Sequence, residues 1–124
     1  MKLPLNQVSR LGSAKDGTHH WWQQRVTALA LIPLGLWFAI ALLGVDLGSH
    51  AAVVAWIREP MTAILLSLTA GCVIYHSWLG VSVVFEDYTR DAVKLAGLLF
   101  SSFAHMFIFA VCLFSVLRIA LGAD

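Results

Sequence analysis

Charged residues are scarce in this chain of 124 residues, since Asp, Glu, Lys and Arg together make up only 12% of it. Soluble domains contain on average about 25% charged and roughly 45–50% apolar residues, whereas 60% of this sequence is hydrophobic. The eight Lys and Arg residues outnumber the seven Asp and Glu residues by one, so the net charge gives no electrostatic basis for binding nucleic acid. The composition excludes an ordinary soluble domain and favours a membrane protein.

Cysteine is also rare, and the two that occur form no recognisable motif. Cys72 and Cys112 lie in separate apolar runs and fit neither a CxxC pair nor the spacing of a zinc site. We expect both to be buried free thiols. The first 25 residues lack the apolar core and the small-residue cleavage site of a secretory signal peptide, so we expect the first membrane span itself to direct insertion.

Three long stretches contain no Asp, Glu, Lys or Arg: residues 26–45, 61–85 and 95–117. Crossing the hydrocarbon core of a bilayer takes about 20 helical residues, and backbone groups in lipid must be satisfied within the segment. The sequence therefore predicts an all-α membrane protein with three transmembrane helices. They form a single membrane-anchor domain over residues 1–124, in which residues 1–25 are a cytoplasmic N-terminal segment. Pro33 is expected to kink the first helix and Pro60 to begin the second.

Basic residues near the expected helix ends are unevenly distributed between the two sides of the membrane. Six lie on the side of the N-terminus and the second loop, against two on the other side: Lys2, Arg10, Lys15, Arg25, Arg90 and Lys94 against Arg58 and Arg118. Since Lys and Arg accumulate in cytoplasmic segments, we expect a cytoplasmic N-terminus and a periplasmic C-terminus. Aromatic side chains occupy the positions of interfacial belts: Trp21, Trp22, Trp56 and Tyr88.

His76 is an ionisable residue inside the second expected span. A neutral imidazole there either ligates a metal or haem or forms a hydrogen bond with a neighbouring helix. Gly80 follows one turn later and leaves space for a flat macrocycle, and Asp87 lies about three turns later on the same face, roughly 16 Å away along the axis. Asp87 and Tyr88 are suited to binding or protonating a small polar head group. The alternative for this pair is a solvated helix end with an aromatic anchor.

Two further residues have open alternatives. His105 in the third span is either a second cofactor ligand or a partner in an interhelical hydrogen bond. Arg25, at the start of the first span, either extends to lipid phosphates or pairs with the carboxylates of a cofactor.

Two motifs stand out. The first, Gly17-Thr-His19…Arg25-Val-Thr27, leads into the first span, and the second, His76-Ser-Trp-Leu-Gly80…Glu86-Asp87-Tyr88, belongs to the second span and its end. In a chain of three spans they resemble the small cytochrome-b-type membrane anchor of succinate dehydrogenase, the D-type subunit. The resemblance implies that His76 is an axial ligand of haem b and that a C-type partner anchor supplies the second ligand. The two anchors would then pack into a haem-binding helix bundle.

The resemblance also implies further contacts. It places Asp87 and Tyr88 in the ubiquinone site, where the phenol donates a hydrogen bond to a quinone carbonyl. It places Arg25 and His19 near the haem propionates. His20 is an equally placed alternative to His19.

The implied protein is a subunit without catalytic activity of its own, because the sequence has no flavin motif and no cysteine cluster. It would hold the flavoprotein and iron–sulfur subunits against the bacterial inner membrane, with a mitochondrial inner membrane as the alternative. Two other functions remain open. One is the anchor of a fumarate reductase, and the other is a small proton-conducting membrane protein in which His76 and His105 form a relay.

Overall fold

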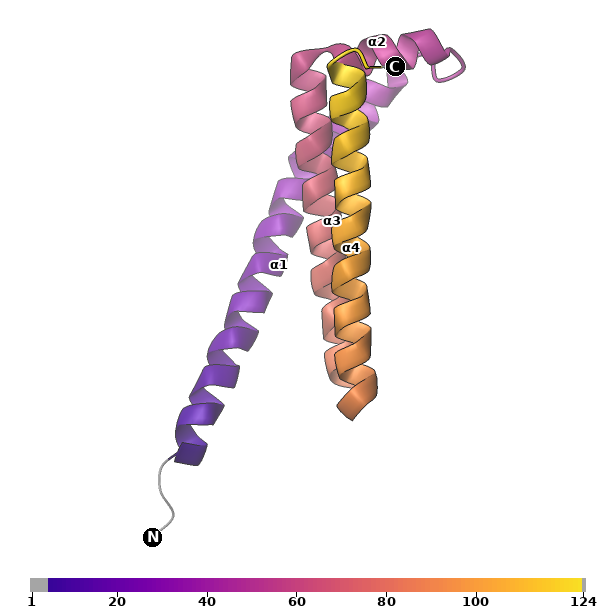
Figure 1. Ribbon diagram of the computed structural model, residues 1–124. Helices are drawn as coiled ribbons and strands as arrows, with labels where there is room; N and C mark the ends of the chain where they lie inside the picture. The colour runs from indigo at the N-terminus through magenta and orange to yellow at the C-terminus, as the bar shows by residue number, and fades with distance from the viewer. Residues whose placement is uncertain (1–4, 124) are drawn as a thin grey trace.

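The computed structural model describes the backbone of residues 5–123 and the side chains of residues 17–123, and within these bounds it contains four helices and no strand (Figure 1). The helices are α1 (Leu5–Leu43), α2 (His50–Arg58), α3 (Pro60–Tyr88) and α4 (Asp91–Ala120). Lys2 and its neighbours up to residue 4 lie outside the described residues.

Three of these helices are long and apolar enough to cross a bilayer. The spans are Gly17–Leu43 within α1, the whole of α3 and the whole of α4, with 27, 29 and 30 residues. At 1.5 Å per residue each reaches roughly 40–45 Å, which exceeds the hydrocarbon core of about 30 Å. The predicted all-α fold with three spans is confirmed. α3 and α4 extend past both ends of the uncharged stretches that predicted them, whereas α1 ends two residues short of the end of its stretch.

α1 begins much earlier than its apolar stretch. It starts at Leu5 and runs for 39 residues, about 58 Å of helix. Most of the polar segment predicted for residues 1–25 therefore continues the transmembrane helix instead of forming a separate structure. The helix also passes through Pro33 without ending. Pro60 occupies the first turn of α3, as predicted.

α2 lies in a segment that the sequence alone presented as a loop. The Ser49 side chain accepts a hydrogen bond from the backbone N–H of Ala52 and so caps the N-terminus of α2. Trp56 of α2 stacks on Trp37 of α1, with the ring centroids 6.4 Å apart. Arg58 donates a hydrogen bond to the carbonyl of Ile119 near the end of α4. A nine-residue helix is too short to show a clear periodicity in the sequence. Its stability depends on these contacts with the other helices.

α3 packs against both of its long neighbours, whereas the backbones of α1 and α4 do not come close to each other within the described chain. α1 crosses α3 and leans away from it toward the N-terminal end (Figure 1). The N-terminal end of α1 and the turn between α3 and α4 lie at one end of the molecule, and α2 and the C-terminus lie at the other. This arrangement groups the basic residues of α1 with Arg90 and Lys94, as the charge count predicted.

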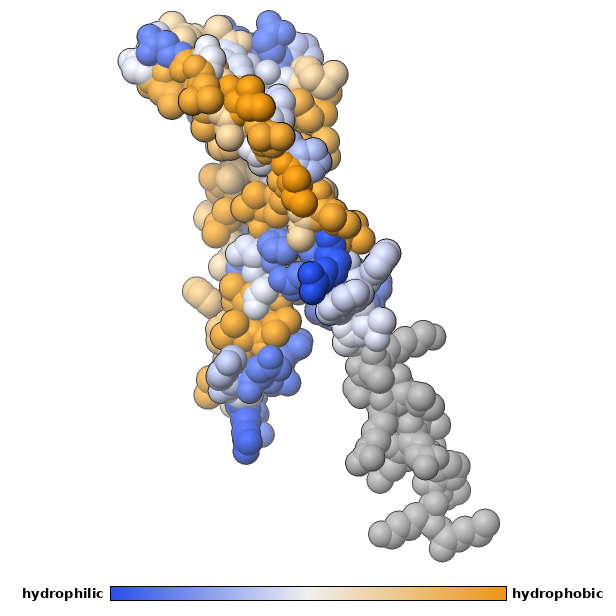
Figure 2. Space-filling view, turned by 180° about the vertical axis from the view of Figure 1, so that it is seen from behind, coloured by the Kyte–Doolittle hydropathy of each residue, from blue (hydrophilic) through white to orange (hydrophobic). Residues whose placement is uncertain are grey.

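Very little of the described chain is buried. The side chains inside are Leu79 and Ser82 of α3 and Ser101 of α4, where small residues allow two helices to approach closely. Cys72 and Cys112 are free, as predicted, but they are only half-buried because the single chain has so small a core. The remaining apolar surface (Figure 2) requires lipid or other subunits to cover it.

Candidate functional site

A groove opens between α1 and α3 where α1 starts to lean away. Its volume is about 920 Å³, and it is lined by Gly17, His19, His20, Trp21, Gln24, Arg25 and Ala28 of α1 and by His76, Val83 and Glu86 of α3. Figure 2 shows hydrophilic side chains gathered where the two helices diverge, bordered by apolar side chains. The groove brings together three residues that the sequence singled out from different segments: His19, Arg25 and His76.

His76 is half-buried and is held by α1. Its Nδ1 lies 2.9 Å from Oγ1 of Thr27, and the same hydroxyl lies 2.9 Å from the carbonyl oxygen of Gln23 and 3.1 Å from that of Gln24. Among the described residues, the structure gives the second ring nitrogen, Nε2, no hydrogen-bond partner. His76 therefore presents one engaged nitrogen to α1 and one free nitrogen for a ligand.

Gly80 lies beside His76 at the contact between α1 and α3. A Cβ at this position would meet Nε2 of Gln24 at 3.7 Å, an ordinary van der Waals distance, so the glycine brings Gln24 of α1 close to this turn of α3. Gln24 itself lines the groove, and no motif in the sequence pointed to it.

The α1 wall of the groove combines cationic and aromatic groups. The guanidinium of Arg25 lies 5.4 Å from the centroid of the Trp21 ring, in a cation–π contact. The Nδ1 atom of His20 is buried and has no hydrogen-bond partner within the described part of the chain, and its ring lies 6.3 Å from that of Trp78. A buried unpaired nitrogen is unfavourable, and a polar group bound in the groove would satisfy it.

Asp87 and Tyr88 do not line this groove. Both are exposed at the end of α3, and 83% of the Tyr88 surface is accessible. Glu86 lines the groove instead. α1 leans away from α3 toward this end of the molecule (Figure 1), and neither the carboxylate nor the phenol is covered by the described chain.

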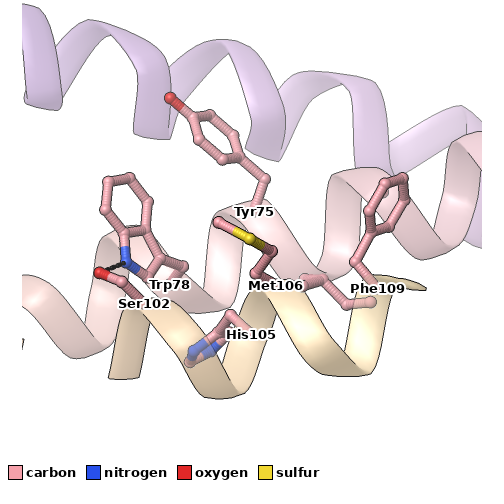
Figure 3. Close-up of a pocket in the computed structure, with 8 residues that line it drawn as sticks. Tyr75, Trp78, Ser102, His105, Met106 and Phe109 are labelled. Carbon is pink, nitrogen blue, oxygen red and sulfur yellow. Dashed lines mark hydrogen bonds between the residues drawn. The ribbon is translucent and has the colours of Figure 1, made fainter. Parts of the chain in front are cut away.

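His105 lies at the other face of α3. Its Nε2 is 3.2 Å from Oγ of Ser77 on α3, and its Nδ1 is 2.8 Å from the backbone carbonyl of Ser101. The expected interhelical hydrogen bond is therefore present. In Figure 3, His105 borders a pocket of about 350 Å³ between α3 and α4, next to the hydrogen bond from Nε1 of Trp78 to Oγ of Ser102, at 3.0 Å. This pocket is almost entirely apolar.

No complete metal site is formed by the chain within its described residues, where no three His, Cys, Asp or Glu side chains come together. A single histidine nitrogen without a described partner can supply one ligand to a metal, so any further ligand would come from outside this part of the chain. The groove volume lies at the upper end of the range of roughly 300–1,000 Å³ for small-molecule sites, and its cationic wall suits the carboxylates of a macrocycle. The residues present therefore fit a haem that is shared with another subunit.

Three apolar helices with a histidine-lined groove, and very little core of their own, define a small membrane subunit that is completed by partners. The sequence profile of the family described as succinate dehydrogenase/fumarate reductase transmembrane subunit matches residues 1–117. This match covers nearly the whole chain, and the chain belongs to that family.

Individual relatives agree with the family assignment. The chain is 35% identical to the succinate dehydrogenase hydrophobic membrane anchor subunit of Rickettsia bellii over 119 residues, which are 95% of this chain and 87% of the relative. It is 28% identical to the subunit of the same name from Paracoccus denitrificans over 120 residues, or 97% and 93% of the two chains. The subunit of Rickettsia conorii is 33% identical over 70% of each chain. No solved structure matches this chain. The resemblance drawn from the sequence is confirmed, and the chain is a membrane anchor of the succinate dehydrogenase type.

Proposed function

We propose that this anchor supplies one axial ligand of a haem b, Nε2 of His76, and that a C-type anchor subunit supplies the second. The observation that carries the proposal is the groove between α1 and α3, where His76 has one nitrogen engaged by Thr27 and the other free. His76 lines this groove together with His19 and Arg25. A neutral imidazole fixed through its second nitrogen is the usual state of a metal-bound histidine.

The α1 wall is suited to the polar edge of the haem. The guanidinium of Arg25 can pair with a propionate, and His19 lies on the same wall. His20 remains the alternative to His19, and its unpaired Nδ1 favours it as a donor or acceptor toward a bound polar group. When bound, the haem supplies one-electron redox chemistry. The role of the chain is to orient it and to neutralise its carboxylates.

The end of α3 is proposed to contribute to ubiquinone binding. Tyr88 would donate a hydrogen bond to a quinone carbonyl, and Asp87 would handle a proton next to it. Both side chains are exposed in the single chain, so the quinone site requires partner subunits to enclose it. The chain would then be a single membrane-anchor domain without catalytic activity of its own.

The proposed partners are the C-type anchor, the iron–sulfur subunit and the flavoprotein subunit, surrounded by membrane lipids. The basic residues at the end with Arg90 and Lys94 support a cytoplasmic N-terminus and a periplasmic C-terminus in a bacterial inner membrane. The iron–sulfur subunit would then dock beside Asp87 and Tyr88. The fumarate reductase anchor remains the alternative within the family, whereas the names of the relatives favour an anchor over a proton-conducting protein.

Replacement of the haem ligand tests this function. The whole complex is purified from native membranes, and its reduced-minus-oxidised spectrum is recorded for wild type, His76→Leu and His105→Leu. We expect His76→Leu to lose the b-type bands of the assembled complex. His105→Leu is the matched control, because it removes another intramembrane histidine that is already bonded to Ser77, and it should keep the bands. A normal b-type spectrum in assembled His76→Leu complex would contradict the proposal.

A further inference from the structure

Thr27 and His76 are 49 residues apart in the sequence and meet at the contact between α1 and α3. We propose that the Thr27 hydroxyl is a positioning residue: it holds the His76 ring in the tautomer and orientation that leave Nε2 free for iron. This inference rests on the proposed function, because it concerns the same haem ligand. It goes further by assigning to Thr27 a role in tuning the haem.

Counting hydrogens around the Thr27 hydroxyl identifies the donor and the acceptor. The hydroxyl carries one hydrogen, and two backbone carbonyls of its own helix, those of Gln23 and Gln24, lie within 2.9 and 3.1 Å. A carbonyl can only accept, and a threonine inside a helix commonly donates to the carbonyl three or four residues earlier. With its hydrogen on a carbonyl, Oγ1 must accept from Nδ1–H of His76. The tautomer assigned in this way places the lone pair of the neutral ring on Nε2.

His105 shows what distinguishes His76. Its Nδ1 lies 2.8 Å from the Ser101 carbonyl, which also forces the proton onto Nδ1. However, Nε2 of His105 faces Oγ of Ser77 at 3.2 Å, so a hydroxyl of α3 already occupies it. Both histidines therefore have the same tautomer. Of their two Nε2 atoms, only that of His105 has a hydrogen-bond partner among the described residues, whereas His76 lines the groove with Nε2 unengaged.

Loss of the Thr27 hydroxyl should change the haem as well as its affinity. An acceptor on Nδ1–H makes the imidazole a stronger donor to the metal and fixes its plane. Without that acceptor, less electron density reaches the iron, so the ferric form is less stabilised and the midpoint potential moves to a more positive value. The affinity for haem should fall about 10–100-fold, as it does when such supporting hydrogen bonds are removed from metal sites.

The test uses the whole complex from native membranes and four forms of this subunit: wild type, Thr27→Val, Thr27→Ser and Thr69→Val. Thr27→Val keeps the shape of the side chain and removes the hydroxyl. Thr27→Ser restores it. Thr69→Val is the matched control, because the Thr69 hydroxyl donates to the Leu65 carbonyl at 2.7 Å within α3 and contacts no histidine that the structure describes.

The measurements are haem content per assembled complex, the midpoint potential from a spectroscopic redox titration, and the electron paramagnetic resonance signal of the low-spin ferric haem. We expect Thr27→Val to lose haem, raise the potential and broaden the signal, and we expect Thr27→Ser and Thr69→Val to resemble wild type. Assembly is scored separately, by copurification of the other subunits.

Three outcomes would overturn the inference. The first is a Thr27→Val complex with wild-type haem content, potential and resonance signal. The second is an equal change in Thr69→Val, which would indicate a general effect of losing a helix hydroxyl. The third is loss of assembly in Thr27→Val with normal assembly in Thr27→Ser, which would make the hydroxyl a determinant of folding. These outcomes leave the proposed function intact, since that function fails only when His76→Leu keeps its b-type spectrum.

Discussion

The two faces of α3 differ in how tightly they are packed. Toward α4, the Phe85 ring lies against Gly97, Nε1 of Trp78 donates a hydrogen bond to Oγ of Ser102, and the smaller pocket of about 350 Å³ at this contact is almost entirely apolar. Toward α1, it borders an open groove of about 920 Å³ lined by ionisable side chains. One helix thus has a closer-packed face toward α4 and an open face toward α1, where the proposed haem would bind. The difference indicates that α3 finds most of its packing partners within this chain on the side of α4, and that its side toward α1 leaves space for another molecule.

Gly97 gives the most severe test of the closer-packed face. A Cβ at this glycine of α4 would overlap the ring of Phe85 on α3, so Gly97→Ala forces the ring or the helix to move. Overpacking of this kind costs about 1–3 kcal/mol. The unfolding of the purified complex, followed by thermal denaturation in detergent, should shift to a lower temperature.

Gly35→Ala is the matched control, because nothing lies within 4 Å of a Cβ at that position of α1. In a helix interior alanine is favoured over glycine by roughly 0.8–1 kcal/mol, so this variant should be as stable as wild type or more stable. Equal destabilisation by the two substitutions would remove the distinction between a closed contact at α4 and an open helix surface at α1.

The sequence predicts those features that a single segment determines, and it does not predict those that depend on contacts between distant segments. Runs without charge predict the three spans, because the thickness of the bilayer sets a length that single segments must meet. The position of His76 in such a run leaves a ligand and a hydrogen-bonded histidine as alternatives, and the proposed ligand role comes from the resemblance of its motif to the family. The place of His76 in one groove with Arg25 follows only from the way α1 crosses α3.

Other features could not be predicted because they depend on contacts between distant segments. Thr27 engages a ring 49 residues away, and Gln24 of α1 lines a groove whose other wall comes from α3. The exposure of Tyr88 depends on which helices lie beside the end of α3. The nine residues of α2 are too few to show a clear helical pattern, and the helix is stabilised by contacts with Trp37 of α1 and with α4.

A substitution of Tyr88 tests whether α3 has a functional role beyond the groove, at its C-terminal end. Tyr88→Phe keeps the ring and deletes the hydroxyl, which should cost about 0.5–1.5 kcal/mol of quinone binding or transition-state stabilisation. Since roughly 1.4 kcal/mol is a factor of ten in rate, succinate-dependent quinone reduction should fall several-fold. The assay compares ubiquinone with an artificial acceptor that takes electrons before the quinone site.

The artificial acceptor supplies the control for that experiment, because its rate should stay near the wild-type value when assembly is intact. Asp87→Asn should show the same split through loss of a proton-handling group. If Tyr88→Phe reduced quinone at the wild-type rate with haem and assembly intact, Tyr88 would be only an interfacial aromatic residue.

Ser102 probes the closer-packed face at the level of one hydrogen bond. Its Oγ accepts from Nε1 of Trp78 at 3.0 Å across the contact between α3 and α4, and it also donates to the Leu98 carbonyl of its own helix. Ser102→Ala should therefore cost about 0.6 kcal/mol, the average for an interhelical hydrogen bond in a membrane protein, measured as a small decrease in the unfolding temperature. Ser115→Ala serves as the comparison, since the exposed Ser115 hydroxyl bonds only the Val111 carbonyl of α4 in the described structure. A Ser102→Ala complex no less stable than Ser115→Ala would mean that small side chains and close packing, and not this hydrogen bond, hold α3 to α4.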